Sequence, residues 1–109
     1  MYARVWKVGI LPGKAEEFAA DVKSLIPAWR KMSGFRGLFV LRTGTAMLEG
    51  TVVSLWETLE ALRDSENSTF RQAVVRILSF CEPHPLVREE EVLVCEFASP
   101  EPSDITVIS

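Results

Sequence analysis

The chain has few of the residues that build metal and nucleophile sites. Among its 109 residues there is one histidine, His84, and there are two cysteines, Cys81 and Cys95. A single histidine excludes a histidine-rich metal site and a catalytic histidine pair, and Cys81 with His84 has no second pair of ligands to complete a tetrahedral zinc site. A glycine-rich phosphate loop is missing too, because residues 34–37 (GFRG) precede a predicted strand and not a helix. We therefore predict neither a metal nor a cofactor.

Long apolar runs and an excess of positive charge are also missing. No stretch of eighteen apolar residues occurs, and charged residues stand within residues 1–7, where a signal peptide would have its apolar segment. We therefore expect a cytoplasmic protein with no membrane partner, whose cysteines are free thiols in small buried side chains; a disulfide is the alternative. The formal net charge is -3 and the basic residues alternate with acids. No basic stripe is left for a nucleic acid partner.

What is present is the composition of one globular core, at 48% hydrophobic and 25% charged residues. The first strand is predicted over residues 2–11, with both faces partly apolar and therefore covered. The apolar period then becomes helical. It runs through Phe18, Val22, Leu25, Trp29 and Met32. Pro27 predicts a break in this helix at residues 24–26, because proline lacks the N–H that continues the helix.

The second half of the chain repeats this order. Strands are predicted over residues 35–43 and 47–56, joined as a hairpin. Thr58 is the predicted cap of a helix from Leu59, and Ser68 is the predicted cap of a further helical segment that ends before Pro83. The last strand is predicted over residues 91–97, after an acidic run (Glu89 to Glu91) interpreted as a solvated strand entrance.

This order predicts an α+β, ferredoxin-like βαββαβ fold, with a four-stranded antiparallel sheet and both helical regions on one face. The predicted strands and their ends carry more apolar residues than one covered face can hold. They are Val5, Leu11, Val53, Leu55, Val92 and Val94. An uncovered apolar sheet face is an association surface, so we expect a homodimer in which two such faces meet.

Three motifs, taken in their order along the chain, resemble those of the dimeric α/β-barrel superfamily, and within it the antibiotic biosynthesis monooxygenase type of domain. They are LPGKAEEF at 11–18, SGFRG at 33–37, and LWETLEAL at 55–62 followed by NSTF at 67–70. The resemblance covers roughly residues 2–98. It implies a dimeric α/β barrel of two facing sheets, with one ligand cavity per subunit between the sheet and its own helices. We expect residues 1–98 to form the domain and residues 99–109 a tail that is flexible or docked on the partner subunit.

Known activities of this family include cofactor-free oxygenation of aromatic molecules and oxidative haem degradation. The haem-degrading members use an asparagine on the first strand and a tryptophan and a histidine on the second helix. Those places fall near Trp6, Ser65 and Val74 or Val75 in this sequence, so none of the three residue types is present. Haem degradation is therefore disfavoured, and tight haem binding with a spectrum that changes under reductant would revive it.

Four residues are the predicted ligand-binding set: Arg4, Trp6, Trp29 and Phe70. The resemblance places Trp6 on the cavity side of the first strand, and Arg4 shares that face, where a guanidinium needs an anionic partner. The partner is either structural, from Glu96 or Asp21, or the carboxylate or phenolate of a ligand. Core packing is the alternative role of each aromatic side chain.

No catalytic residue is assigned, because Tyr2, Glu96 and His84 are general-base candidates without geometric support. The first hypothesis is a cofactor-independent monooxygenase-like protein that acts on a small aromatic or polyketide-like molecule. The second is a non-catalytic dimeric module of the same fold that binds a ligand or serves in a stress response. Fold alone does not separate the two.

Overall fold

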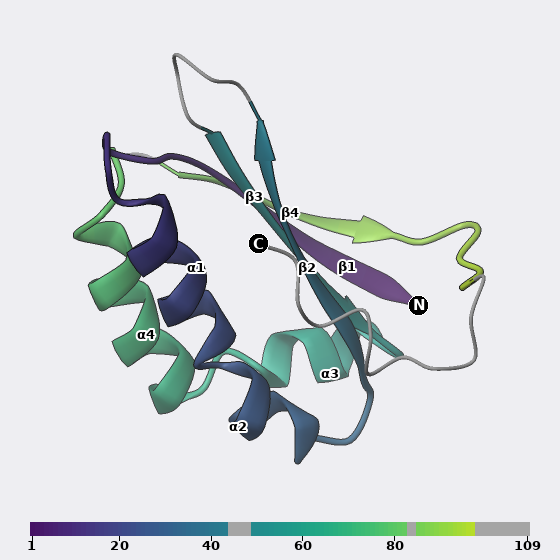
Figure 1. Ribbon diagram of the computed structural model, residues 1–109. Helices are drawn as coiled ribbons and strands as arrows, with labels where there is room; N and C mark the ends of the chain where they lie inside the picture. The colour runs from purple at the N-terminus through teal and green to yellow at the C-terminus, as the bar shows by residue number, and fades with distance from the viewer. Residues whose placement is uncertain (44–48, 83–84, 98–109) are drawn as a thin grey trace.

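A four-stranded antiparallel sheet with helices packed on one of its faces makes up residues 1–43, 49–82 and 85–97, which are the residues that this computed structural model describes (Figure 1). The elements in chain order are β1 (Tyr2–Gly9), α1 (Ala15–Lys23), α2 (Ile26–Arg30), β2 (Phe35–Thr43), β3 (Glu49–Trp56), α3 (Leu59–Asp64), α4 (Ser68–Leu78) and β4 (Leu86–Glu91). The strand order is β2-β3-β1-β4. This confirms the predicted ferredoxin-like α+β fold. The predicted tail at 99–109 and the first residues of the predicted third strand, 47 and 48, lie outside the described ranges.

Strand β1 lies in the middle of the sheet and divides its residues between two faces. Because successive side chains of a strand point to opposite faces, the even residues share the helix-covered face and the odd residues share the open face. Arg4, Trp6 and Val8 are buried under the helices, whereas Lys7 is exposed and Val5 half-buried on the open face. The first strand is shorter than predicted, because regular pairing ends at Gly9.

The helical half of the core follows the predicted period. Phe18 and Val22 of α1 and Trp29 of α2 are buried against the covered face of the sheet. The helix breaks between Lys23 and Ile26, as Pro27 predicts, and the proline stands at the start of α2. A proline is tolerated there because the first N–H groups of a helix have no partner within the helix.

The caps of α3 and α4 come from side chains just ahead of each helix. Thr58 Oγ1 accepts a hydrogen bond from the Ala61 N–H at 3.0 Å, which confirms the predicted cap of α3. The cap of α4 is Asn67, whose Oδ1 accepts from the Phe70 N–H at 3.0 Å. The predicted cap, Ser68, was wrong, because Asn67 holds the extended conformation of a capping residue and Ser68 is already helical.

The last strand lies earlier in the chain than predicted. β4 spans Leu86–Glu91 and not residues 91–97, because its position is set by pairing with β1, where Leu86 faces Lys7 and Glu91 faces Tyr2. β1 then has no further residues to pair, and the chain makes one last contact, from the Val92 N–H to the Met1 carbonyl. β4 is an edge strand with every residue exposed, so its sequence shows no apolar alternation.

Residues 92–97 therefore leave the sheet, although their sequence favours a strand. Leu93 and Val94 are 85% and 87% exposed, and Phe97 packs over Phe39 of β2 with ring centroids 6.4 Å apart. Val92 and Val94 thus do not belong to the sheet, and neither does Leu11.

The open face is partly apolar. Val5 faces Val53, and Val53 faces Phe39 across the next pair of strands. Leu55 is buried on this face, while Leu41 and Leu86 are each about half exposed (49% and 48%). The predicted open-face residues Val5, Val53 and Leu55 are thus found there, on the side of the sheet away from the helices.

The C-terminal end of α4 is joined to the turn after β1 by backbone contacts. The Leu11 N–H donates to the Phe80 carbonyl at 2.9 Å and the Glu82 N–H to the Gly9 carbonyl at 2.8 Å. Ile10 and Cys81 form an isolated β-bridge between these bonds. This junction, residues 9–11 with 80–82, fixes the end of α4 to the sheet. None of the described helices has the length and apolar character needed to cross a bilayer.

Gly34 gives a stability test with a matched control. Its φ is +91° and a Cβ built there would lie 2.8 Å from Ala61 Cβ, whereas Gly13 has a φ of +77° and open space around that position. We expect Gly34→Ala to lower the free energy of unfolding by about 3 kcal/mol, from backbone strain plus overlap. Gly13→Ala should cost about 1 kcal/mol, from strain alone. Urea unfolding of both variants at one protein concentration measures the difference, and equal losses would contradict it.

The two cysteines give a second test. Both are free thiols, as predicted, but only Cys81 is buried; Cys95 is exposed, which corrects the expectation that both are buried. Burial raises the pKa of the Cys81 thiol, so less thiolate is present at mildly alkaline pH. We expect a chromogenic disulfide reagent to modify Cys81 at least about tenfold more slowly than Cys95. The Cys95→Ser variant should then lose the fast phase, and a remaining fast phase would contradict the assignment.

Candidate functional site

Arg4 is the charged group at the centre of the helix-covered face, and it is only 4% exposed. Its Nη2 donates to the Leu62 carbonyl at 2.7 Å and to Glu66 Oε1 at 3.1 Å, and its Nη1 donates to Ser65 Oγ at 2.9 Å. The acidic partner is therefore Glu66. The predicted structural partners, Glu96 and Asp21, were wrong, because the guanidinium reaches the junction between α3 and α4.

Burial governs the electrostatics of this guanidinium. Loss of solvent lowers the pKa of Arg4, and the negative charges of Glu66 and then Glu89 oppose that shift. The Glu66 side chain is 50% exposed and the Arg4 side chain 5%, so the cation has much less water around it than its partner. A cation in this position gains stability from any further anionic oxygen that reaches it.

Aromatic rings continue from Arg4 into the core. Arg4 Cζ lies 4.9 Å from the centroid of the Phe70 ring, which is a cation–π geometry. Phe70 stacks on Trp29 with centroids 5.8 Å apart and planes 21° apart, and Trp29 meets Trp56 edge-on at 5.2 Å. The structure therefore brings three of the four predicted ligand-binding residues, Arg4, Trp29 and Phe70, into one contiguous group.

The fourth, Trp6, follows Arg4 on the covered face of β1 and belongs to the same buried cluster. Within the described residues, the Nε1–H groups of Trp6 and Trp29 are buried without a hydrogen-bond acceptor. Trp56 differs, because its Nε1–H donates to Ser54 Oγ at 3.0 Å. Buried indole N–H groups usually have a partner, so these two offer unused donors to an oxygen brought in by a ligand.

The general-base candidates lie apart from this group. The Tyr2 hydroxyl donates to Glu91 Oε2 at 3.4 Å at the edge of the sheet. Glu96 is exposed in the segment after β4, and His84 lies outside the described residues. Among the residues that the structure describes, no group of three or more His, Cys, Asp or Glu side chains is placed to hold a metal ion.

Sequence reasoning missed Ser65 and Glu66. Neither residue is among the predicted partners of Arg4, although Ser65 is fully buried and both accept hydrogen bonds from the guanidinium. The available signal was Arg4 itself: a buried arginine needs acceptors, and the end of a helix supplies carbonyl oxygens. Which helix end supplies these acceptors to Arg4 is decided by the three-dimensional arrangement and not by the sequence nearby.

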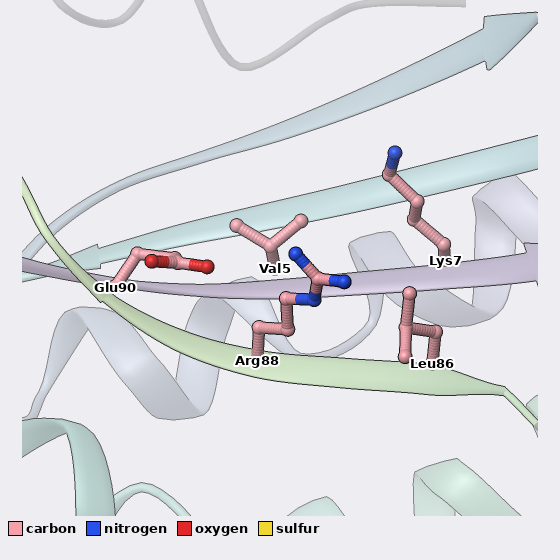
Figure 2. Close-up of a pocket in the computed structure, with 5 residues that line it drawn as sticks. All are labelled: Val5, Lys7, Leu86, Arg88 and Glu90. Atoms are coloured by element: carbon pink, nitrogen blue, oxygen red, sulfur yellow. The ribbon is translucent and has the colours of Figure 1, made fainter.

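A separate hollow of about 200 Å³ lies on the open face, on the other side of the sheet from the aromatic group. Its lining residues come from β1 and β4: Val5, Lys7, Leu86, Arg88 and Glu90. Figure 2 shows the Arg88 side chain reaching from β4 toward Val5, with the Glu90 carboxylate on the other side of Val5. The resemblance implies a cavity between the sheet and its helices, and this hollow is not in that place.

Comparison with solved structures supports the fold. A protein from Bordetella bronchiseptica, named as a candidate antibiotic biosynthesis monooxygenase, superposes with a TM-score of 0.72 at 21% identity, over 85% of this chain and 97% of the other. A protein of the same description from Caulobacter crescentus CB15 gives 0.74 at 18% identity, over 85% and 90%. A conserved protein from Methanosarcina mazei Go1 gives 0.70 at 20% identity, over 82% and 90%. Such identities establish a shared fold only.

Sequence comparison adds the family. No curated protein sequence matches the chain. The family model of the antibiotic biosynthesis monooxygenases matches residues 1–76, from the first strand into α4. The matched region holds Arg4 and its three acceptors, the two indoles with unused N–H groups, and Phe70. The chain belongs to the antibiotic biosynthesis monooxygenase family.

Proposed function

We propose that the chain is a cofactor-independent monooxygenase-like protein that acts on a small, planar aromatic molecule with an anionic oxygen. The observation that carries the proposal is the grouping of a buried guanidinium with stacked aromatic rings and two unused indole N–H groups. A cation beside rings suits an aromatic anion, and unused donors suit its oxygen atoms.

The reaction needs no cofactor when the substrate supplies all the electrons. A phenol with an open para C–H, once deprotonated at oxygen, gives one electron to O2, and the resulting radical pair combines at the para carbon. In the overall change the ring C–H and O–H bonds break and a quinone carbonyl forms. One atom of O2 enters the substrate, and the other leaves as water with the two hydrogens. The protein's tasks are to hold the anion and to exclude water.

Each predicted site residue has a role in this scheme. Arg4 holds the phenolate and lowers the energy of the anion, since it stands in a poorly solvated place. Trp29 and Phe70 form the walls, and the Nε1–H groups of Trp6 and Trp29 donate to the substrate's oxygen atoms. No described residue is assigned as the base, so the substrates that suit the site are phenols acidic enough to bind as anions.

A non-catalytic ligand-binding module is the second candidate function. The contacts of Arg4 favour it, because the Leu62 carbonyl, Ser65 and Glu66 already accept hydrogen bonds from the guanidinium. In this case Arg4 holds the α3–α4 junction in place, and the site binds a ligand without turnover. Ligand binding without oxygen consumption distinguishes this function from the first.

Oxygen consumption with a panel of phenols that carry an open para C–H, with no metal or flavin added, tests the first proposal. Trp6→Phe and Trp29→Phe keep an aromatic ring and remove an unused N–H. If each N–H donates to substrate, kcat/KM should fall about fivefold per variant, the value of one hydrogen bond of about 1 kcal/mol. Trp56→Phe is the control, because its N–H is already bonded to Ser54.

Two outcomes contradict this proposal. One is oxygen uptake no faster than in protein-free buffer across the panel. The other is an equal loss in Trp56→Phe, which would mean that packing and not hydrogen bonding is being measured. Circular dichroism of each variant verifies that the fold is retained.

We further propose that two copies pair through their open sheet faces. The support is the apolar character of that face, where Val5, Val53 and Phe39 are half-buried and Leu41 and Leu86 are about half exposed. Apolar surface of this kind gains free energy when a second copy covers it. A two-fold pairing presents the same patch twice, so the hollow beside Val5 would be closed by the partner.

Sedimentation velocity of Leu41→Lys tests this pairing. A lysine in place of a half-exposed leucine leaves the monomer fold intact but puts an unpaired charge into the interface, so the dimer dissociation constant should rise at least about tenfold. Val75→Lys is the matched control, since Val75 is 72% exposed on α4, on the helical side of the sheet. A wild-type chain that sediments as a monomer at tens of micromolar would refute the pairing.

A further inference from the structure

The three acceptors of Arg4 differ in how firmly the fold holds them. The Leu62 carbonyl is backbone near the end of α3, and Ser65 is fully buried. Glu66 is half exposed, stands in the short connection between α3 and α4, and reaches Arg4 with one carboxylate oxygen at 3.1 Å. Glu66 is therefore the one described acceptor that can leave Arg4 without displacing backbone or a buried residue.

Glu66 is also the one acceptor of the three that carries a negative charge, as the proposed ligand does. The other two are neutral dipoles, whereas Glu66 supplies an anionic oxygen to a buried cation whose Cζ lies 4.9 Å from the centroid of the Phe70 ring. A pair with one half-exposed member is held weakly, because the carboxylate recovers its hydration when it leaves. An incoming aromatic anion also brings an apolar ring to the neighbourhood of Phe70, a contact that the Glu66 carboxylate does not make.

We infer that Glu66 holds the place of a ligand's anionic oxygen on Arg4, and that its displacement makes the site selective for planar aromatic monoanions; this rests on the proposed ligand site at Arg4. The ligand class is an aromatic carboxylate or phenolate with a second oxygen for an indole N–H. Glu66 is a specificity-determining residue in this scheme. Its charge opposes anion entry, and its departure leaves the cation free to bind.

Binding of naphthoate and of its neutral counterpart naphthamide, measured by quenching of tryptophan emission, tests this inference. All three tryptophans of the chain lie in the buried cluster, so quenching reports on this region. In Glu66→Gln the side chain keeps its size and an oxygen that accepts from Arg4, but loses the charge. Naphthoate should bind about fivefold or more tightly than to the wild type, and naphthamide binding should change by less than about twofold.

Glu89→Gln is the matched control. Glu89 lies near enough to influence Arg4 electrostatically, but its described contact is with Arg63 at 3.2 Å. This variant removes the same charge without freeing Arg4, so naphthoate binding should change by less than about twofold. Equal gains in Glu66→Gln and Glu89→Gln would show a general charge effect and overturn the role of Glu66.

The other adverse outcomes are equally definite. Unchanged naphthoate affinity in Glu66→Gln, equal gains for naphthoate and naphthamide, or no quenching by naphthoate up to millimolar concentration would each overturn the inference. Urea unfolding of Glu66→Gln verifies that the variant is folded. Because the assay measures binding, a protein that shows this anion selectivity but consumes no oxygen would contradict only the monooxygenase proposal.

Discussion

The hydrogen bonding of one buried guanidinium organises the covered side of this protein. Arg4 stands in the middle of the sheet under the helices, where water cannot solvate it, so the chain must bring acceptors to it. The end of α3 supplies the Leu62 carbonyl, and the connection to α4 supplies Ser65 and Glu66. These contacts link the sheet to the helices at the point where the helical direction changes. The aromatic group then packs beside the cation.

Because β1 is a central strand, its alternating side chains contribute to both the covered face and the open face of the sheet. Even residues of β1 belong to the covered face with Arg4 and Trp6, and odd residues belong to the open face with Val5. The proposed ligand site and the proposed dimer contact therefore lie back to back across one layer of backbone. The charge of β4 is divided in the same way, since Glu90 lines the open hollow while Glu89 pairs with Arg63 of α3.

The sequence predicts what local chemistry determines. Pro27 locates the helix break, Thr58 locates a cap, and the apolar period locates the buried helix positions. Features that depend on a partner far away in the sequence are not predicted. The segment 92–97 has strand character yet lies outside the sheet, because β1 pairs with residues 86–91 instead. In the same way, the acidic partner of Arg4 is Glu66, which the sequence does not predict. Neither its spacing from Arg4 nor its polar surroundings distinguish it from other surface carboxylates.

The junction between residues 9–11 and 80–82 has a consequence for how α4 is held. It ties the C-terminal end of α4 to the sheet through backbone on both sides of Ile10. The opposite end of α4 begins at Ser68 and is capped by Asn67, next to the half-exposed Glu66 carboxylate. The two ends of α4 are therefore fastened differently, by backbone hydrogen bonds after its C-terminal end and by side-chain contacts of Ser65 and Glu66 with Arg4 just ahead of its N-terminal end, so a side-chain substitution can loosen only the second attachment.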